Sequence, residues 1–425
     1  MKENRLGNNM KRQKNYKLLS LFSGCGGMDL GFDGDFMVHE KSVNPKYHVD
    51  FVQRKDTGRM VWLRPTSFEI VFANDITRYG KNAWVHNFKK RGYDEKIYHL
   101  ESIVDLVKWH KQGKNIFPND VDIVTGGFPC QDFSVSGSRM GFKSGKDHTG
   151  KSVNVSTAST ESRGKLYMWM KEVIDIVQPK IFIAENVKGL VNLDNVKDII
   201  QQDFSRAHGN GYVVLPPKVL QAAFYGVPQS RERVFFIGIK KNELKKGILE
   251  KLMKDPVPEE FDPYPSPSHA VGNSKDYSSA VKIKDIFKSL EEPGETRDLS
   301  QKYFSKAKYM GKHCQGQTEI NLDGVGPTIR SEHHGNIEYR RLSSKNGGKI
   351  TSELEKGLAE RRLTPRECGL IQTFPPDYEF VIPNGNKRFL VSTSSAYKLI
   401  GNAVPPLLAY HLAKRIEKLW NEYFK

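Results

Sequence analysis

Short apolar runs alternate with amphipathic segments along the first half of the chain. Residues 17–21, 69–73, 121–124, 181–184, 212–215, 218–222 and 233–239 form runs rich in β-branched and aromatic side chains, which are typical of buried strands. Between them, apolar residues recur at helical spacing up to 32, from 103 to 107, from 166 to 177 and from 196 to 204. This alternation predicts an α/β, doubly wound domain with a Rossmann-like sheet. In such sheets, ligands bind at the carboxyl ends of the strands.

The periodicity weakens after a proline-rich stretch, 255–268, where we place a domain boundary. One clear helix start follows it: Thr364 and Glu367 have the spacing of a capping box, with Pro365 at the first helical position. The C-terminus reads as a further amphipathic helix. We expect a basic disordered arm at 1–16, a large domain at 17–265, a smaller irregular domain at 266–390 and a C-terminal segment at 391–425.

Two segments interrupt the alternation in the large domain. Segment 33–68 mixes glycine, proline and charged residues, and we interpret it as an insertion that contains a hairpin. Segment 144–160 consists mainly of glycine, serine, threonine and lysine, so it cannot bury enough apolar surface to order itself.

Polar blocks follow three of the predicted strands. Gly24, Gly26 and Gly27 form a turn where backbone amides can approach a ligand, although an ordinary strand–helix turn has the same composition. Asp75 is placed either to bind ribose hydroxyls or to cap a helix. Cys130 lies on a rigid Pro-Cys turn. It is either a reactive thiol or a small apolar side chain buried in the core. These blocks should meet at one edge of the sheet.

The glycine turn, the Cys130 block and four later blocks resemble, in order, the motifs of the DNA (cytosine-5) methyltransferases of the bacterial restriction-modification type. The six blocks are Leu21-Phe22-Ser23-Gly24-Cys25-Gly26-Gly27, Gly127-Phe128-Pro129-Cys130-Gln131, Ala184-Glu185-Asn186-Val187, Gln229-Ser230-Arg231-Glu232-Arg233, Arg362-Leu363-Thr364-Pro365-Arg366-Glu367 and Gly401-Asn402-Ala403-Val404. By this resemblance the large domain is catalytic, the smaller domain recognises the target, and the C-terminal segment returns to the catalytic domain.

The resemblance implies methyl transfer from S-adenosyl-L-methionine to carbon 5 of cytosine in a specific duplex DNA sequence, after the base has been flipped out of the helix. Carbon 5 is a poor nucleophile until the Cys130 thiolate adds to carbon 6, which is covalent catalysis. Glu185 is then expected to hold or protonate N3 of the base. Arg231 and Arg233 are expected to supply positive charge near the thiolate.

The resemblance also implies two sets of binding residues. For the cofactor they are Phe22, Gly24, Cys25, Gly26, Gly27, Asp75, Ile76, Ser102, Ile103, Gly127, Pro129, Leu166, Asn402 and Ala403. For DNA they are Gln131, Ser134, Ser136, Gln229, Thr328, Ile329, Arg330, Arg340 and Arg341. Segment 134–160 is expected to close over the DNA.

Composition agrees with a nucleic-acid partner. The 425 residues contain 66 Lys and Arg against 49 Asp and Glu, a formal net charge of +17, which suits a polyanion. The four cysteines lie far apart, without zinc-ligand or disulfide spacing, and favour a reducing cytoplasm. No apolar run approaches transmembrane length. We expect a monomer without bound metal, whose cognate restriction endonuclease, if present, acts without direct contact.

Three alternatives stay open at this point. An RNA (tRNA) cytosine-5 methyltransferase would use the same scaffold, but the long, loop-rich recognition region favours DNA. A non-catalytic nucleic-acid-binding module would not need Cys130, Glu185 and Arg233 together. A nicotinamide-dependent enzyme is disfavoured because the glycine fingerprint after the first strand is incomplete.

Overall fold

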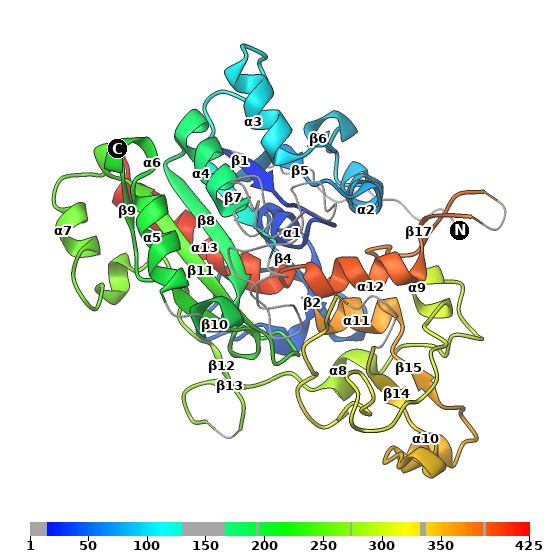
Figure 1. Cartoon of the computed structure of the whole chain (residues 1–425). Coiled ribbons are helices and arrows are strands. Elements are labelled where there is room, and N and C mark those ends of the chain that lie inside the picture. The colour runs from blue at the N-terminus through cyan, green and yellow to red at the C-terminus, as the bar shows by residue number, and fades with distance from the viewer. Residues whose placement is uncertain (1–14, 130–165, 193–194, 273, 332–336, 386–387) are drawn as a thin grey trace.

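A computed structural model describes residues 15–129, 166–192, 195–272, 274–331, 337–385 and 388–425 (Figure 1). Its centre is an eight-stranded sheet in the order β10-β11-β8-β7-β1-β5-β6, with β9 also paired to β11. The strands are β1 (Tyr16–Leu21), β5 (Phe68–Asn74), β6 (Tyr98–His99), β7 (Ile123–Gly127), β8 (Ile181–Val187), β9 (Tyr212–Val214), β10 (Lys218–Gln221) and β11 (Glu232–Lys240).

The sheet is parallel except at one strand. Strands β5, β1, β7 and β8 run the same way, whereas β11 is antiparallel to β8 and also to β9 and β10. Parallel strands buried on both faces need apolar residues throughout, and β8 has them. Ile181 and Ile183 pack on one face of the sheet, and Phe182 and Ala184 pack on the other.

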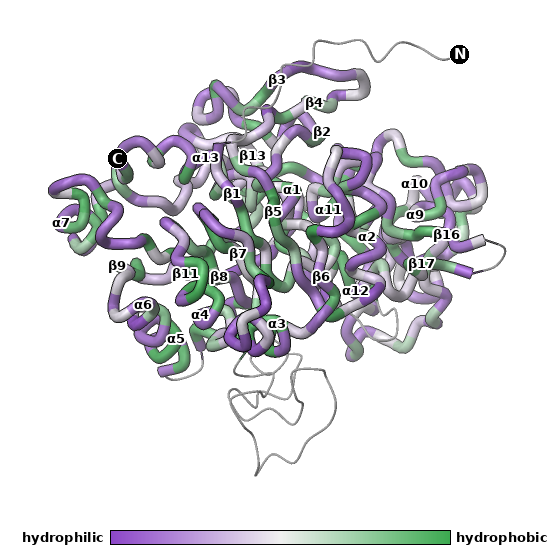
Figure 2. Tube along the Cα trace, turned by 90° about the horizontal axis from the view of Figure 1, so that it is seen from above, coloured by the Kyte–Doolittle hydropathy of each residue, from purple (hydrophilic) through white to green (hydrophobic). Residues whose placement is uncertain are grey.

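Helices cover both faces, as Figure 2 shows with the sheet between them. One face holds α3 (Ile103–Lys111), α4 (Leu166–Val177), α5 (Val196–Ser205) and α6 (Ala207–Asn210). The other holds α1 (Gly27–Asp33), α2 (Arg78–Lys89) and the C-terminal α13 (Pro406–Tyr423). Helices α1 and α13 pack closely, since a Cβ on Gly31 would lie 2.5 Å from Ala409 Cβ. The expected doubly wound α/β fold is thereby confirmed.

The insertion after α1 is a small antiparallel sheet. Its strands are β2 (Met37–His39), β3 (Val52–Lys55) and β4 (Met60–Leu63), in the order β2-β4-β3. The hairpin that we expected is β3–β4, and β2 adds a third strand on the other side of β4.

After α7 (Ile248–Leu252), the elements become short. They are β12 (His269–Ala270), β13 (Ser278–Ser279), α8 (Ile283–Phe287), α9 (Leu299–Lys302), β14 (Tyr339–Arg341), α10 (Thr351–Leu354), β15 (Arg361–Arg362), α11 (Pro365–Ile371), β16 (Ile382–Pro383), β17 (Phe389–Val391) and α12 (Thr393–Asn402). Helix α11 begins with the predicted capping box: Glu367 N donates to Thr364 Oγ1 at 3.0 Å, and Thr364 N donates to Glu367 Oε2 at 2.9 Å.

Two differences from the sequence prediction concern the site. Strand β8 continues past Ala184 to Val187, so Glu185 lies within a strand. Helix α12 was not predicted, and it carries Gly401 and Asn402 at its end. The division into four domains stays a prediction. Within the described residues, no helix is long and apolar enough to cross a membrane.

Candidate active site

The turn after β1 is held in an unusual backbone conformation. Phe22 and Gly24 have φ values of 55° and 53°, and Gly26 has a φ of 79°. The left-handed region is uncommon for an aromatic residue and occurs most often where a functional site fixes the backbone. Gly26 also lacks space for a side chain, because a Cβ there would lie 2.5 Å from the Phe88 ring. The turn therefore requires glycine both for its conformation and for its packing.

Asp75 joins this turn to the end of β5. Gly24 N donates to Asp75 Oδ2 at 3.1 Å. Thr77 donates to Asp75 Oδ1 through its backbone N at 2.8 Å and through its hydroxyl at 2.7 Å. Burial raises the pKa of the Asp75 carboxyl, and the hydrogen bonds from Thr77 and Gly24 oppose that shift. These contacts are compatible with both alternatives for Asp75. It accepts hydrogen bonds from the chain that enters α2, as a helix cap would, and its carboxylate can still accept hydrogen bonds from a ligand.

Three other predicted cofactor residues follow the carboxyl ends of the paired strands β5 and β6. Ile76, next to Asp75, is 46% exposed, which is high for an isoleucine. Ser102 caps α3, with its hydroxyl accepting from Val104 N at 3.3 Å, and Ile103 is buried behind it.

The segment that ends α12 closes against the glycine turn. A Cβ on Gly27 would lie 3.0 Å from Ala403 Cβ and 2.4 Å from the Val404 carbonyl oxygen. Asn402 is exposed and Ala403 is half-buried. Residues nearly four hundred positions apart in the chain therefore meet around the first turn, as expected for the two ends of one binding site.

Cys25 is positioned differently from its glycine neighbours. Its thiol is 1% exposed and lies 3.8 Å from the Leu399 carbonyl oxygen, and the Tyr378 hydroxyl donates to the Cys25 carbonyl. Burial raises the pKa of the thiol far above its ordinary value, so this cysteine stays protonated and unreactive. Leu166, at the start of α4, is likewise buried in the core.

The ends of β7 and β8 bring Gly127 and Glu185 side by side. The two residues are paired in register, and a Cβ on Gly127 would lie 2.8 Å from Glu185 Oε2. Glycine at 127 is therefore what leaves room for the carboxylate. Strand β7 ends here, three residues before Cys130.

Arg233, near the start of β11, holds the Glu185 carboxylate. Its Nε lies 2.9 Å from Glu185 Oε1, and both side chains are nearly buried. Burial raises the pKa of Glu185, while the charges of Arg233 and Arg231 pull it down, and the net direction is upward. A carboxyl balanced in this way can accept a hydrogen bond when ionised and donate one when protonated.

Asn186 fixes the chain that leads from β7 toward Cys130. Its amide nitrogen donates to the Phe128 carbonyl at 3.2 Å, and its amide oxygen accepts from Val187 N at 2.8 Å. Pro129, next along, is half-buried. Sequence reasoning placed Asn186 in a motif without giving it a role. The predicted residues Cys130, Gln131, Ser134 and Ser136, like segment 134–160, lie outside the described residues.

Gln229 and Arg231 occupy a fully buried junction, not the DNA-facing and catalytic positions expected of them. Arg231 donates to the carbonyl oxygens of Ile329, Gly401 and Ala403 at 2.8–2.9 Å. Gln229 Oε1 accepts from Ile329 N at 3.0 Å, which leaves the amide no free face toward DNA. The block thus connects the catalytic sheet to the recognition segment at Ile329 and to the segment that closes the glycine turn.

Gln372 completes this junction, and sequence reasoning missed it. Its Oε1 accepts from Gln229 Nε2 at 3.0 Å, and its Nε2 donates to the Ile400 carbonyl at 2.6 Å. A lone glutamine just after a short helix gives no signal in the sequence, because its partners lie far away in the chain.

The predicted DNA residues of the second domain separate into two groups. Thr328 and Arg330 are partly exposed, and the Arg330 guanidinium lies 3.7 Å from Glu338 Oε1. Arg340 and Arg341, by contrast, are buried, and both pair with Glu353. This placement corrects our expectation that these two guanidinium groups face DNA.

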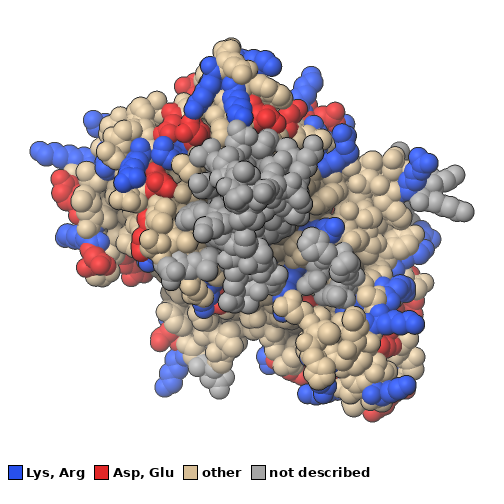
Figure 3. Space-filling view, in the orientation of Figure 1, with Lys and Arg blue, Asp and Glu red and all other residues tan. Residues whose placement is uncertain are grey.

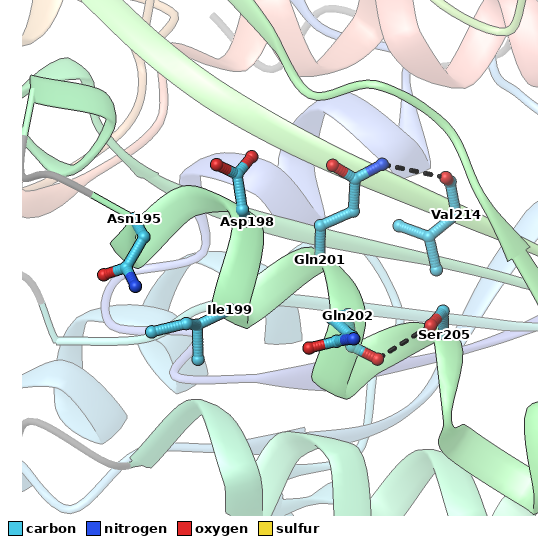
Figure 4. Close-up of a pocket in the computed structure, with 7 residues that line it drawn as sticks. All are labelled: Asn195, Asp198, Ile199, Gln201, Gln202, Ser205 and Val214. Atoms are coloured by element: carbon cyan, nitrogen blue, oxygen red, sulfur yellow. Dashed lines mark hydrogen bonds between the residues drawn. The ribbon is translucent and has the colours of Figure 1, made fainter.

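A surface pocket of about 460 Å³ lies elsewhere, along α5 (Figure 4). It is lined by side chains of α5 and by Val214 of β9, and Gln201 Nε2 donates to the Val214 carbonyl at 3.2 Å. None of the predicted site residues lines it, and it contains no cationic side chain. We therefore assign it no part in the active site.

Comparisons with known proteins agree with the geometry. The family model described as C-5 cytosine-specific DNA methylase matches residues 16–418. Type II methyltransferase M.FnuDI of Fusobacterium nucleatum is 29% identical over 95% of this chain and 94% of its own length. Type II methyltransferase M.BsuRI of Bacillus subtilis is 30% identical over 95% of this chain and 80% of its own length.

Solved structures show the same fold. A mutant DNMT2 of Spodoptera frugiperda superposes with a TM-score of 0.56 at 19% identity, covering 95% of this chain and 99% of that one. Dnmt2 of S. pombe gives a TM-score of 0.53 at 15% identity, covering 95% and 99%.

Proposed function

Because the chain belongs to the C-5 cytosine-specific DNA methylase family and is a DNA cytosine-5 methyltransferase of the bacterial restriction-modification type, we propose that it methylates carbon 5 of cytosine within one specific duplex DNA sequence. The observation that carries this proposal is the buried Glu185–Arg233 pair. Glu185 is paired in register with Gly127, the last residue of β7, and Cys130 follows Gly127 by three residues in the chain. Protection of host DNA against a cognate nuclease, without contact between the two proteins, is the corresponding biological role.

The residues around the glycine turn fit S-adenosyl-L-methionine. When bound, that cofactor supplies the methyl group. The Gly24–Gly27 turn lies so close to Ala403 that Gly27 has no room for a side chain. A ligand at this turn would therefore contact the backbone groups of the glycines. The Asp75 carboxylate can accept from ribose hydroxyls, and the exposed side of Ile76 can cover an adenine ring. The free thiols among the described cysteines agree with the expected reducing cytoplasm.

The chemistry of the base falls to the chain's own side chains. The Cys130 thiolate adds to carbon 6 and forms a carbon–sulfur bond, so that the electron pair of the 5,6 double bond becomes available at carbon 5. Glu185 holds N3 and donates a proton to it as the ring gains charge, for which its raised pKa suits it. Arg233 keeps the carboxyl oriented. After methyl transfer, a base takes the proton from carbon 5, the electron pair of that C–H bond re-forms the 5,6 double bond and expels the thiolate, and N3 returns its proton to Glu185.

A cytosine inside a duplex is inaccessible to such a site, so the base must leave the stack. The substrate is therefore double-stranded DNA with the target nucleotide flipped out toward Glu185. Segment 134–160 follows Cys130 directly and is the part of the chain that we propose closes over the DNA.

Trapping with 5-fluorocytosine tests the proposal. Fluorine at carbon 5 cannot leave as a cation, so the enzyme, with S-adenosyl-L-methionine present, should form an adduct with duplex DNA that survives denaturing electrophoresis. Cys130→Ser should abolish the adduct, because an alcohol is a far poorer nucleophile at neutral pH. The matched controls are Cys25→Ser, Cys314→Ser and Cys368→Ser, which should keep it. An adduct that persists in Cys130→Ser would show that the nucleophile lies elsewhere.

The target sequence comes from bisulfite sequencing of a plasmid propagated with the gene, which reports the modified base and its sequence context together. The RNA alternative is tested in parallel by incubating the enzyme with duplex DNA and with tRNA. Methylation of tRNA alone would overturn the choice of substrate while leaving the site chemistry intact.

A further inference from the structure

One stretch of the second domain carries positive charge without any compensating acid. Between Asp298 and Glu319 the chain has four lysines, Lys302, Lys306, Lys308 and Lys312, and no aspartate or glutamate. All four are exposed. Like charges this close repel one another unless an anion lies among them.

These lysines differ from many others on the surface. Lys41, Lys188 and Lys218, for example, each lie within 2.8 Å of a carboxylate oxygen. Within the part of the chain that the structure describes, none of the four lysines between Asp298 and Glu319 has an ion-pair partner, and only Lys306 has a further contact, over the ring of Phe304. Figure 3 shows basic side chains on the lobe that contains the second domain.

The backbone of this stretch is fixed from behind by Arg362. That side chain is 1% exposed, and its guanidinium donates to the carbonyl oxygens of Ala307 at 2.9 Å, Lys308 at 3.2 Å and Gly316 at 2.8 Å. Its guanidinium also lies 4.2 Å from the Tyr339 ring centroid, and the Tyr339 hydroxyl donates to the Ala307 carbonyl at 3.3 Å. The stretch is therefore preorganised, although it has neither helix nor strand pairing from 303 to 311.

Exposure alternates along it, as in an extended chain. Lys306, Lys308, Met310 and Lys312 are exposed, and the residues between them are half-buried. Alternate residues of an extended segment project to one side, at most roughly 7 Å apart. This spacing is similar to two steps along one DNA strand, at about 3.4 Å of helix axis per phosphate.

We propose that this lysine segment, 306–312, binds every second phosphate along one strand of duplex DNA and contributes affinity without reading sequence. The inference rests on the proposed function, because it places the same DNA substrate on a second surface. Lysine is a flexible point charge without the planar, two-pronged geometry that recognises a base edge, so its contacts should be independent of sequence.

The experiment compares two triple variants with the same change of charge. The test variant is K306Q/K308Q/K312Q. The control is K246Q/K254Q/K418Q, whose lysines are also exposed and unpaired among the described residues but lie around α7 and α13, away from the second domain. Binding to duplex DNA is measured across a range of salt concentrations, without cofactor, so that catalysis plays no part.

A plot of log affinity against log salt has a negative slope, and each lost phosphate contact should reduce the magnitude of that slope by about 0.9. The test variant should therefore lose about 2.7 from the slope if all three lysines bind phosphates. Affinity should fall equally for a duplex that contains the target sequence and for a random duplex. The rate of methyl transfer at saturating DNA should stay at the wild-type value. The control should keep the wild-type slope.

Three results would overturn the inference. An unchanged slope in the test variant would show that the lysines do not touch phosphate, and an equal drop in both variants would show a general charge effect. A change confined to the specific sequence would instead mean that the segment reads bases, which also contradicts it. Failure of the proposed function looks different, because the wild-type protein would then form no adduct with fluorinated DNA.

Discussion

The catalytic sheet and the predicted second domain, 266–390, satisfy their buried backbone by different means. In the sheet, neighbouring strands pair in continuous ladders, as β8 and β11 do from Ile181 to Val187. In the second domain the longest strand has three residues, and buried guanidinium groups bond the carbonyls instead. Arg362 bonds three loop carbonyls, and Arg366 Nη1 donates to the Tyr378 carbonyl at 2.8 Å.

This difference changes how arginines should be interpreted in such a domain. A buried polar group needs a partner, and an arginine with five donors can satisfy several carbonyls where no ladder exists. Among the described residues of the second domain, five arginines are buried: Arg340, Arg341, Arg361, Arg362 and Arg366. Arginine content therefore overstates the number of DNA contacts in this domain, and the exposed lysines are better candidates.

Breaking one buried ion pair of the second domain should show the difference between the two regions most clearly. Arg361 binds both carboxylate oxygens of Glu367 at 2.9 Å, and Glu367 is 1% exposed. Arg361→Met should lower the free energy of unfolding by about 3–5 kcal/mol, because it removes the bidentate partner of a buried carboxylate and leaves it, among the described residues, only Thr364 N and the Arg340 guanidinium at 3.8 Å. Urea denaturation followed by circular dichroism gives the value.

The matched control is Arg206, whose pair with Asp203 is 3.7 Å long and whose side chain is 58% exposed. Arg206→Met should change the unfolding free energy by less than about 1 kcal/mol, because exposed ion pairs are weak. Equal effects of the two substitutions would show that the second domain does not depend on its buried guanidinium groups.

Adjacent glycines in β7 provide a comparison within the catalytic region. Gly127→Ala places a Cβ 2.8 Å from Glu185 Oε2, whereas Gly126→Ala would contact the flexible end of Met170 at 3.0 Å. Displacing the Glu185 carboxylate by about 1 Å should lower kcat roughly a hundredfold, the loss typical of such a misplacement. Gly126→Ala should keep kcat within a few-fold of wild type. A methylation assay at saturating DNA and cofactor distinguishes them, and equal rates would mean that Glu185 has room to move.

The sequence predicted the catalytic region better than the second domain, for physical reasons. Buried parallel strands require continuous apolar runs, and the run at 181–184 marks β8 directly. The capping box at Thr364 was also predictable, because it is a local interaction. The pairing of Arg341 with Glu292, 49 residues away, leaves no periodic signal. For the same reason, motifs located Glu185 and Asp75, but the buried roles of Gln229 and Gln372 appear only in three dimensions.

A second junction, between the insertion, β12 and α13, contains buried histidines, and this should make it sensitive to pH. His48 of the insertion, His269 of β12 and His411 of α13 are all buried, and the His48 and His411 rings are 4.6 Å apart. Burial lowers the pKa of all three, and lowers that of His48 to about 4, with His269 adding to the shift and Asp50 opposing it.

The sign follows from the two pKa values of His48. Its ordinary pKa in an unfolded chain is about 6.5, so as pH falls from there to about 4 the unfolded state binds a proton that the folded state does not. Stability is then lost by up to about 1.4 kcal/mol per pH unit, and the loss ends below the folded pKa. His48→Phe, which keeps a ring stacked on Phe51, should remove this part of the slope, as measured by urea unfolding between pH 6.5 and 4.5. The control His313→Gln changes an exposed histidine and should leave the slope unchanged. An identical slope in His48→Phe and wild type would show that the junction opens and hydrates His48 before the protein unfolds.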